Sequence, residues 1–148
     1  MKITAAEVKK LREATGAGIM DAKRALEEAQ GEMKKAKEII KAKGIVRAEK
    51  KAERETGVEH VFSYVHFNGR TGSLVKLACE TDFVAKTEDF QKLGKEIAMQ
   101  IASMAPKSVS ELLKQDYLRS PGQTIKSLIQ EVSGKTGENV RIIEIAKL

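Results

Sequence analysis

Few side chains in this sequence suit metal binding or acid–base catalysis: there are two histidines, His60 and His66, and one cysteine, Cys79. The histidines lie six positions apart in a segment predicted to be a strand, which separates them by roughly 20 Å at ~3.3 Å per residue. They therefore cannot share a metal ion or a proton. A zinc site needs several Cys or His ligands at short spacings, which one cysteine does not provide. We expect no metal site and no catalytic cluster.

Gly134-Lys135-Thr136 matches the end of a phosphate-binding loop. That motif also requires a glycine five positions before Gly134, where this sequence has Ile129, and it follows a strand rather than the helix predicted here. The glycines that would surround a phosphate are thus missing. We interpret Gly134 and Gly137 as a helix C-cap and a turn, and we expect no cofactor and no enzyme activity.

The segment Thr81-Asp82-Phe83-Val84 joins a predicted strand to a long predicted helix. Two interpretations of these residues stay open. In the first, Thr81 or Asp82 caps the helix and Phe83 packs inward as a hydrophobic staple. In the second, Phe83 and the adjacent carboxylate protrude as a binding wedge, since buried aromatic anchors dominate many protein interfaces.

Three short helices are predicted over the first 43 residues. Thr4 and Glu7 form a capping-box pattern at the start of the first helix. The third helix is predicted to finish near Gly44, so that residues 1–44 form a three-helix module. The residues expected to face its core are Val8, Leu11, Ala14, Ile19, Ala22, Leu26, Ala29, Met33, Ala36 and Ile40.

Residues 45–55 are rich in charge and lose the apolar periodicity, which predicts a solvated, helical linker. They lie within Lys34–Arg54, a stretch of nine basic and three acidic residues that accounts for the whole net charge of +6. No aromatic residue lies among these charges to stack on bases. We therefore favour a solvated helix face, with an RNA-binding adaptor as the alternative, and expect no direct nucleic-acid contact.

Residues 56–148 are predicted to form an α+β core (dimerisation) domain with about three antiparallel strands packed on helices. Residues 58–67 and 74–79 are rich in β-branched and aromatic residues, and the Asn-Gly-Arg-Thr-Gly turn between them tolerates positive φ, which indicates a β-hairpin. The last strand is predicted over 140–146. The other predicted elements are a helix with Phe90, Leu93, Ile97, Ile101 and Met104 on one stripe, a short helix over 109–114, a turn at 120–122 and a helix from Ile125.

No apolar run in the sequence is long enough to cross a membrane, and its first residues lack the apolar core of a secretory signal. The lone cysteine favours a reducing compartment. We expect a cytoplasmic protein without membrane contact.

Three segments resemble the elongation factor Ts family. Residues 11–26, LREATGAGIMDAKRAL, are similar to its N-terminal signature. Gly69-Arg70, Gly72 and Leu74-Val75, followed by ETDFVA at 80–85, are similar to its second signature. GKTGENV at 134–140 is similar to its closing helix-to-strand turn. These matches occur in the family's order and cover nearly the whole chain.

The resemblance implies a guanine nucleotide exchange factor that binds elongation factor Tu and catalyses no bond chemistry itself. The N-terminal bundle would be a ubiquitin-associated (UBA)-like module that docks on the partner's GTPase domain through Ile19, Met20 and Lys23. Core packing remains the alternative for Ile19, because its helical spacing matches that of buried residues.

The resemblance also implies a second contact, formed by Thr81, Asp82, Phe83 and Val84. Asp82 and Phe83 would be the wedge that disturbs the partner's magnesium and phosphate site, so that GDP leaves.

Longer members of the family carry two copies of the core subdomain and a coiled-coil insertion. Here the chain passes from Pro106 almost directly to Leu112, so one core copy is expected. A single copy with about three strands leaves a sheet edge unpaired and an apolar face thinly covered, which predicts a homodimer. A receptor for ubiquitin-like proteins that acts through residues 1–43 is another alternative, but it leaves residues 56–148 without a role.

Overall fold

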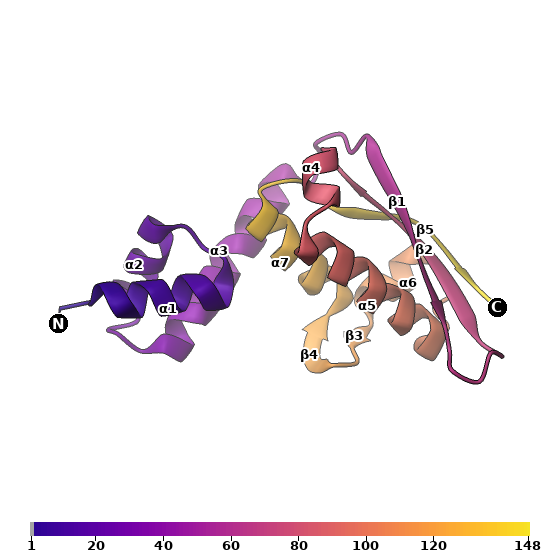
Figure 1. Ribbon diagram of the computed structural model, residues 1–148, viewed down its shortest axis with the longest axis horizontal. Coiled ribbons are helices and arrows are strands. Elements are labelled where there is room, and N and C mark those ends of the chain that lie inside the picture. The colour runs from indigo at the N-terminus through magenta and orange to yellow at the C-terminus, as the bar shows by residue number, and fades with distance from the viewer. Residues whose placement is uncertain (1) are drawn as a thin grey trace.

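Helix α3 joins two groups of elements, a bundle of three helices at one end of the molecule and a sheet covered by helices at the other (Figure 1). The computed structural model describes residues 2–148. In chain order the elements are α1 (Ala5–Thr15), α2 (Ile19–Glu28), α3 (Met33–Lys51), β1 (Val58–Val65), β2 (Gly72–Cys79), α4 (Asp82–Ala85), α5 (Glu88–Met104), α6 (Val109–Lys114), β3 (Asp116–Tyr117), β4 (Ser120–Thr124), α7 (Ile125–Thr136) and β5 (Arg141–Lys147). The predicted α+β class is confirmed.

The N-terminal bundle begins with the predicted capping box. The Thr4 hydroxyl accepts a hydrogen bond from the Glu7 amide at 3.3 Å, and the Glu7 carboxylate accepts one from the Thr4 amide at 2.8 Å. Gly16 ends α1 at a φ of 69°, a conformation that glycine adopts without strain. The bundle buries a small core that consists of Leu11, Ala22, Ala25, Leu26, Ala29 and Ala36.

The main sheet has the order β1–β2–β5, and both strand pairs are antiparallel. Val58 lies opposite Cys79 and Val65 lies opposite Gly72, so the hairpin turn and α4 are at opposite ends of the sheet. Gly69 in this turn has a φ of 70°, as its sequence predicted. The three antiparallel strands expected from the sequence are therefore present.

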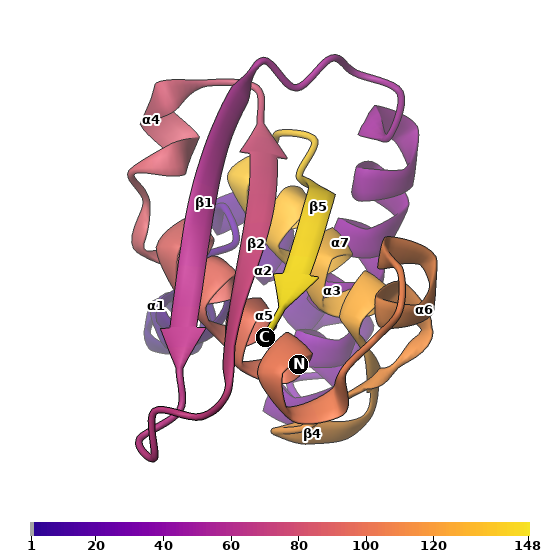
Figure 2. The same cartoon turned by 90° about the vertical axis from the view of Figure 1, so that its right-hand side faces the viewer.

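Helix α5 covers one face of the sheet, and the other face is open toward the viewer in Figure 2. The main core lies between the covered face and the helices. Phe90 on α5 is fully buried, and its ring centroid is 5.8 Å from that of Phe62 on β1. Gly94 permits this close packing, because a Cβ at that position would collide with the Phe62 ring.

Helix α3 does not end near Gly44, as predicted, but continues beyond it and packs along α7. The two helix backbones meet at two glycines, since a Cβ on Gly134 would lie 2.6 Å from the Cα of Gly44. Ala48, one turn further along α3, is also buried. Residues 45–51 therefore continue α3, which packs on α7, although most of their side chains stay exposed to solvent. Gly134 serves helix packing, and the C-cap is Gly137, with a φ of 79°.

Helix ends account for most of the other differences from prediction. Ala14, Ile19 and Met104 were expected to face a core but are exposed. Each lies at or next to an end of its helix, where the neighbouring elements no longer cover the apolar face. In addition, residues 120–122 begin strand β4, which pairs with β3, rather than forming an isolated turn.

Candidate protein-binding surface

Phe83 lies on α4. This single-turn helix lies between β2 and α5 (Figure 1). Phe83 is 83% exposed, and Asp82 beside it is exposed as well. Full coverage of a ring of this size by a partner contributes about 2 kcal/mol to the binding free energy. An exposed aromatic ring next to a carboxylate is therefore suited to protein binding.

The turn that carries Phe83 is held in place by the cap residue Thr81 and by the buried residue Val84. Thr81 caps α4, because its hydroxyl accepts a hydrogen bond from the Val84 amide at 3.3 Å. Val84 is 4% exposed and packs in the main core together with Ala85. Since successive helical residues are about 100° apart, an inward Val84 leaves Phe83 outward. Phe83 is thus not a staple, and Val84, expected on the binding surface, offers a partner almost no area.

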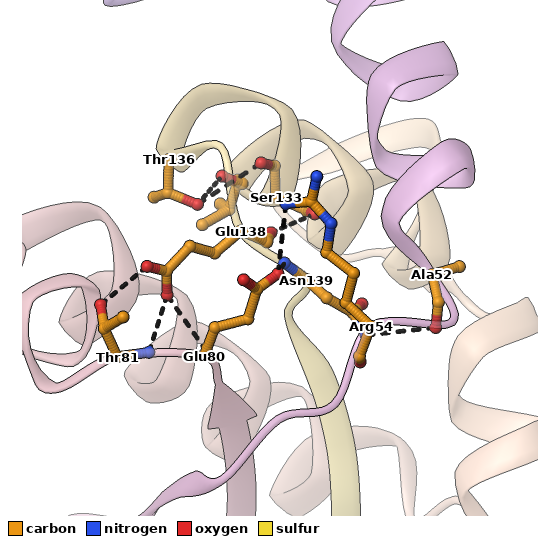
Figure 3. Close-up of polar contacts among 9 residues, drawn as sticks. Ala52, Arg54, Glu80, Thr81, Ser133, Thr136, Glu138 and Asn139 are labelled. Carbon is orange, nitrogen blue, oxygen red and sulfur yellow. Dashed lines mark hydrogen bonds and ion pairs between the residues drawn. The ribbon is translucent and has the colours of Figure 1, made fainter.

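Glu138, a residue that sequence reasoning missed, holds the same turn (Figure 3). Its carboxylate accepts hydrogen bonds from the Glu80 amide at 3.1 Å, the Thr81 amide at 2.9 Å and the Thr81 hydroxyl at 2.7 Å. Glu138 lies in the turn between α7 and β5. Its contact depends on β5 pairing with β2, which no local pattern around Glu138 indicates.

A second exposed cluster lies at the start of α2. Ile19 and Met20 are each 58% exposed, and the side chain of Lys23, one turn further, is 53% exposed. The interpretation of Ile19 as a core residue is therefore wrong. The structure brings together all three of the residues that the family resemblance assigned to partner binding in this bundle.

A groove of about 390 Å³ adjoins this α2 cluster. Its lining residues are Ile3, Ala5, Val8, Lys9, Arg12, Ile19 and Lys23. Apolar side chains line this groove, and three cations lie among them.

Several basic residues of the stretch Lys34–Arg54 are paired with carboxylates. The Arg47 guanidinium is 2.9 Å from the Asp21 carboxylate, which ties α3 to α2. The other pairs are Lys35–Glu32, Lys41–Glu131, Lys43–Glu28 and Arg54–Glu80. Such exposed pairs contribute little to stability, but they reduce the positive charge available to nucleic-acid phosphates. The charge pattern therefore favours a solvated, ion-paired face over an RNA-binding surface.

The residues first considered for chemistry include Cys79 and Gly134-Lys135-Thr136, which belong to the buried end of β2 and to α7. Within residues 2–148, no group of three or more His, Cys, Asp or Glu side chains could hold a metal ion. Cys79 is buried, and burial raises the pKa of its thiol. Gly134-Lys135-Thr136 forms the last turn of α7 rather than a phosphate-binding loop. Over the same described part of the chain, every helix is too short or too polar to cross a membrane.

Comparisons with known proteins agree with the resemblance seen in the sequence. The family model for elongation factor TS matches residues 80–148, which include α4, Glu138 and β5. Elongation factor Ts of Thermosipho melanesiensis is 47% identical over 142 residues, which cover 96% of this chain and 71% of that protein. Elongation factor Ts of Fervidobacterium nodosum is 38% identical over 193 residues, which cover 100% of this chain and 98% of that protein. That alignment is longer than the 148-residue chain, so the relative contains internal residues that this chain lacks.

Proposed function

The chain belongs to the elongation factor Ts family of translation elongation factors, and from that premise we propose that it is a guanine nucleotide exchange factor. It binds elongation factor Tu and promotes GDP release by disturbing the magnesium and phosphate site of that partner. The observation that carries this proposal is the outward position of Phe83, beside Asp82, on a turn fixed by a buried neighbour. We call Asp82 and Phe83 the wedge.

The wedge supplies two kinds of interaction. The Phe83 ring contributes binding free energy when a pocket of the partner covers it, and it displaces the partner's loop as it enters. The Asp82 carboxylate brings a negative charge toward phosphates and so disfavours bound GDP. A thousandfold faster release requires a barrier lower by about 4 kcal/mol, and we assign this lowering to the two interactions together. By linkage, GDP must in turn weaken binding of the factor.

The α2 cluster of Ile19, Met20 and Lys23 provides the second contact, with the GTPase domain of elongation factor Tu. Its support is the exposure of all three residues and the apolar, basic-rimmed groove beside them. This contact holds the partner while the wedge acts. Because both surfaces belong to folded elements, little conformational entropy is lost on binding.

We also propose a homodimer that forms through the open face of the sheet. Val61 and Val65 on β1 are 59% and 68% exposed on this face. Leu74 on β2, which is 48% exposed, lies opposite Ser63 and therefore between them. A second copy would cover this apolar patch by two-fold pairing. Such a dimer would act in the cytoplasm, where translation elongation takes place.

The test is GDP release from elongation factor Tu that has been loaded with a fluorescent GDP and mixed with excess unlabelled GDP. We expect the release rate to rise with the concentration of this protein and then to saturate. An unchanged release rate at saturating protein would contradict the proposal. In that case, salt-dependent binding to RNA or binding to a ubiquitin-like protein would support one of the alternative functions.

A further inference from the structure

Two adjacent residues, Glu138 and Asn139, connect Glu80 and Thr81, which immediately precede the wedge, to the end of α3 (Figure 3). Glu138 accepts the hydrogen bonds from Glu80 and Thr81 described above, immediately before α4. Asn139 is 5% exposed, and its side-chain amide donates to the carbonyl oxygens of Ala52 at 3.1 Å and Arg54 at 2.8 Å. Neighbouring residues of one turn thus hold two segments that are far apart in the sequence.

A third side chain closes this network. The Glu80 carboxylate accepts a hydrogen bond from the Asn139 backbone amide at 2.7 Å, and it lies 3.7 Å from the Arg54 guanidinium. Both segments are therefore fixed to the same turn by contacts that include charged acceptors, which are stronger than neutral hydrogen bonds. Arg54 follows the helix that carries the bundle, whereas Glu80 precedes the wedge.

We propose that Glu138 and Asn139 are positioning residues, which set the orientation of the wedge relative to the α2 cluster. This inference rests on the proposed exchange function and extends it to residues that touch neither surface. Glu138 fixes the turn from which Phe83 projects. Asn139 fixes the residues that follow α3, and so adds to the packing on α7 that holds this helix and the bundle bearing Ile19, Met20 and Lys23.

The two residues act on different steps of exchange. Loss of the Glu138 contacts frees the Glu80 and Thr81 amides and loosens the turn before α4, so the wedge is misplaced after the partner has bound. Loss of the Asn139 side chain instead loosens the bundle, so the partner binds more weakly. The maximal release rate reports the first effect, and the concentration for half-maximal release reports the second.

The experiment compares Glu138→Ala and Glu138→Gln with Glu111→Ala, a control at an exposed glutamate of α6. We expect Glu138→Ala to lower the maximal GDP-release rate about tenfold, as for a lost charge-assisted contact. Glu138→Gln keeps a carbonyl oxygen for the two backbone amides and should recover part of the rate. Glu111→Ala should match the wild type. Asn139→Ala should raise the half-maximal concentration and leave the maximal rate close to that of the wild type.

Amide hydrogen exchange, measured on the protein without its partner, tests this inference independently of the proposed nucleotide-exchange function. In Glu138→Ala we expect faster exchange at residues 80–85, with the amides of α5 as protected as in the wild type. Unchanged exchange at 80–85, or a folded Glu138→Ala variant with the full release rate, would overturn the inference. The wild-type protein could fail to promote GDP release from elongation factor Tu while Glu138→Ala still speeds amide exchange at residues 80–85. In that case the proposed function fails, and the control of the turn by Glu138 stands.

Discussion

At the scale of single residues, Phe83 and Phe90 lie seven positions apart and have opposite surroundings: Phe83 is 83% exposed, whereas Phe90 is fully buried. Phe83→Ala should therefore change the free energy of unfolding by less than about 0.5 kcal/mol. Phe90→Ala should lower it by about 3–5 kcal/mol, because it leaves a cavity in the main core. Urea unfolding of the two variants measures both values. A large loss of stability in Phe83→Ala would show that its ring packs inward.

The residue pattern alone could not decide how Phe83 is oriented. Thr81 and Asp82 indicated the start of a helix, and Thr81 is indeed the cap. Whether Phe83 or Val84 faces inward depends on the rotation of a four-residue helix, which the core contacts of Val84 and the Glu138 carboxylate determine. Neither contact has a signal in the local sequence.

Cys79 gives a second test at this scale. Its side chain is buried, its thiol lies 3.2 Å from the Thr81 carbonyl oxygen, and burial raises its pKa. A raised pKa lowers the fraction of reactive thiolate at any given pH. We expect the native protein to react slowly with Ellman's reagent at pH 8, and the urea-unfolded protein to react at the rate of a free cysteine. Rapid reaction of the native protein would show that the end of β2 opens readily.

At the scale of elements, the contact between α3 and α7 depends on one glycine more than on the other. A Cβ on Gly134 would lie 2.6 Å from the Gly44 Cα, whereas a Cβ on Gly44 would be 3.9 Å from the Gly134 Cα. Gly134→Ala should therefore lower stability by about 1–3 kcal/mol, because it forces the helices apart. Gly44→Ala should raise stability by up to about 1 kcal/mol through helix propensity. Thermal or urea unfolding of both variants checks this asymmetry, and equal effects would contradict it.

Most elements could be predicted because their signals are local. The Thr4–Glu7 capping box and the glycine turn of the β1–β2 hairpin follow from a few neighbouring residues. The continuation of α3 past Gly44 could not be predicted in this way. Its sequence is charged and interrupted by glycine, and the helix is stabilised there by packing against α7, 90 residues later in the chain. The pairing of β3 with β4 was missed because both strands are short.

At the scale of the whole molecule, the open face of the sheet predicts self-association. Wild-type protein at micromolar concentration should have twice the monomer mass of 16.3 kDa in light scattering. Val65→Lys should shift it toward the monomer, because a charge would then lie in the apolar patch. Val46→Lys is the matched control, since Val46 is 50% exposed on α3 and away from the sheet. A monomeric wild-type protein would contradict the dimer.

The central claim is that the wedge causes GDP release from elongation factor Tu. The most direct test measures how fast the Phe83→Ala variant promotes this release, with Phe67→Ala as its control. Phe67 is 93% exposed and follows β1 at the end of the sheet opposite α4, so the two variants remove the same exposed ring at distant places. We predict that Phe83→Ala lowers the maximal release rate about tenfold or more, as for an interface hot spot, and melts like the wild type. Phe67→Ala should retain the wild-type rate. A folded Phe83→Ala variant with full exchange activity would contradict the central claim.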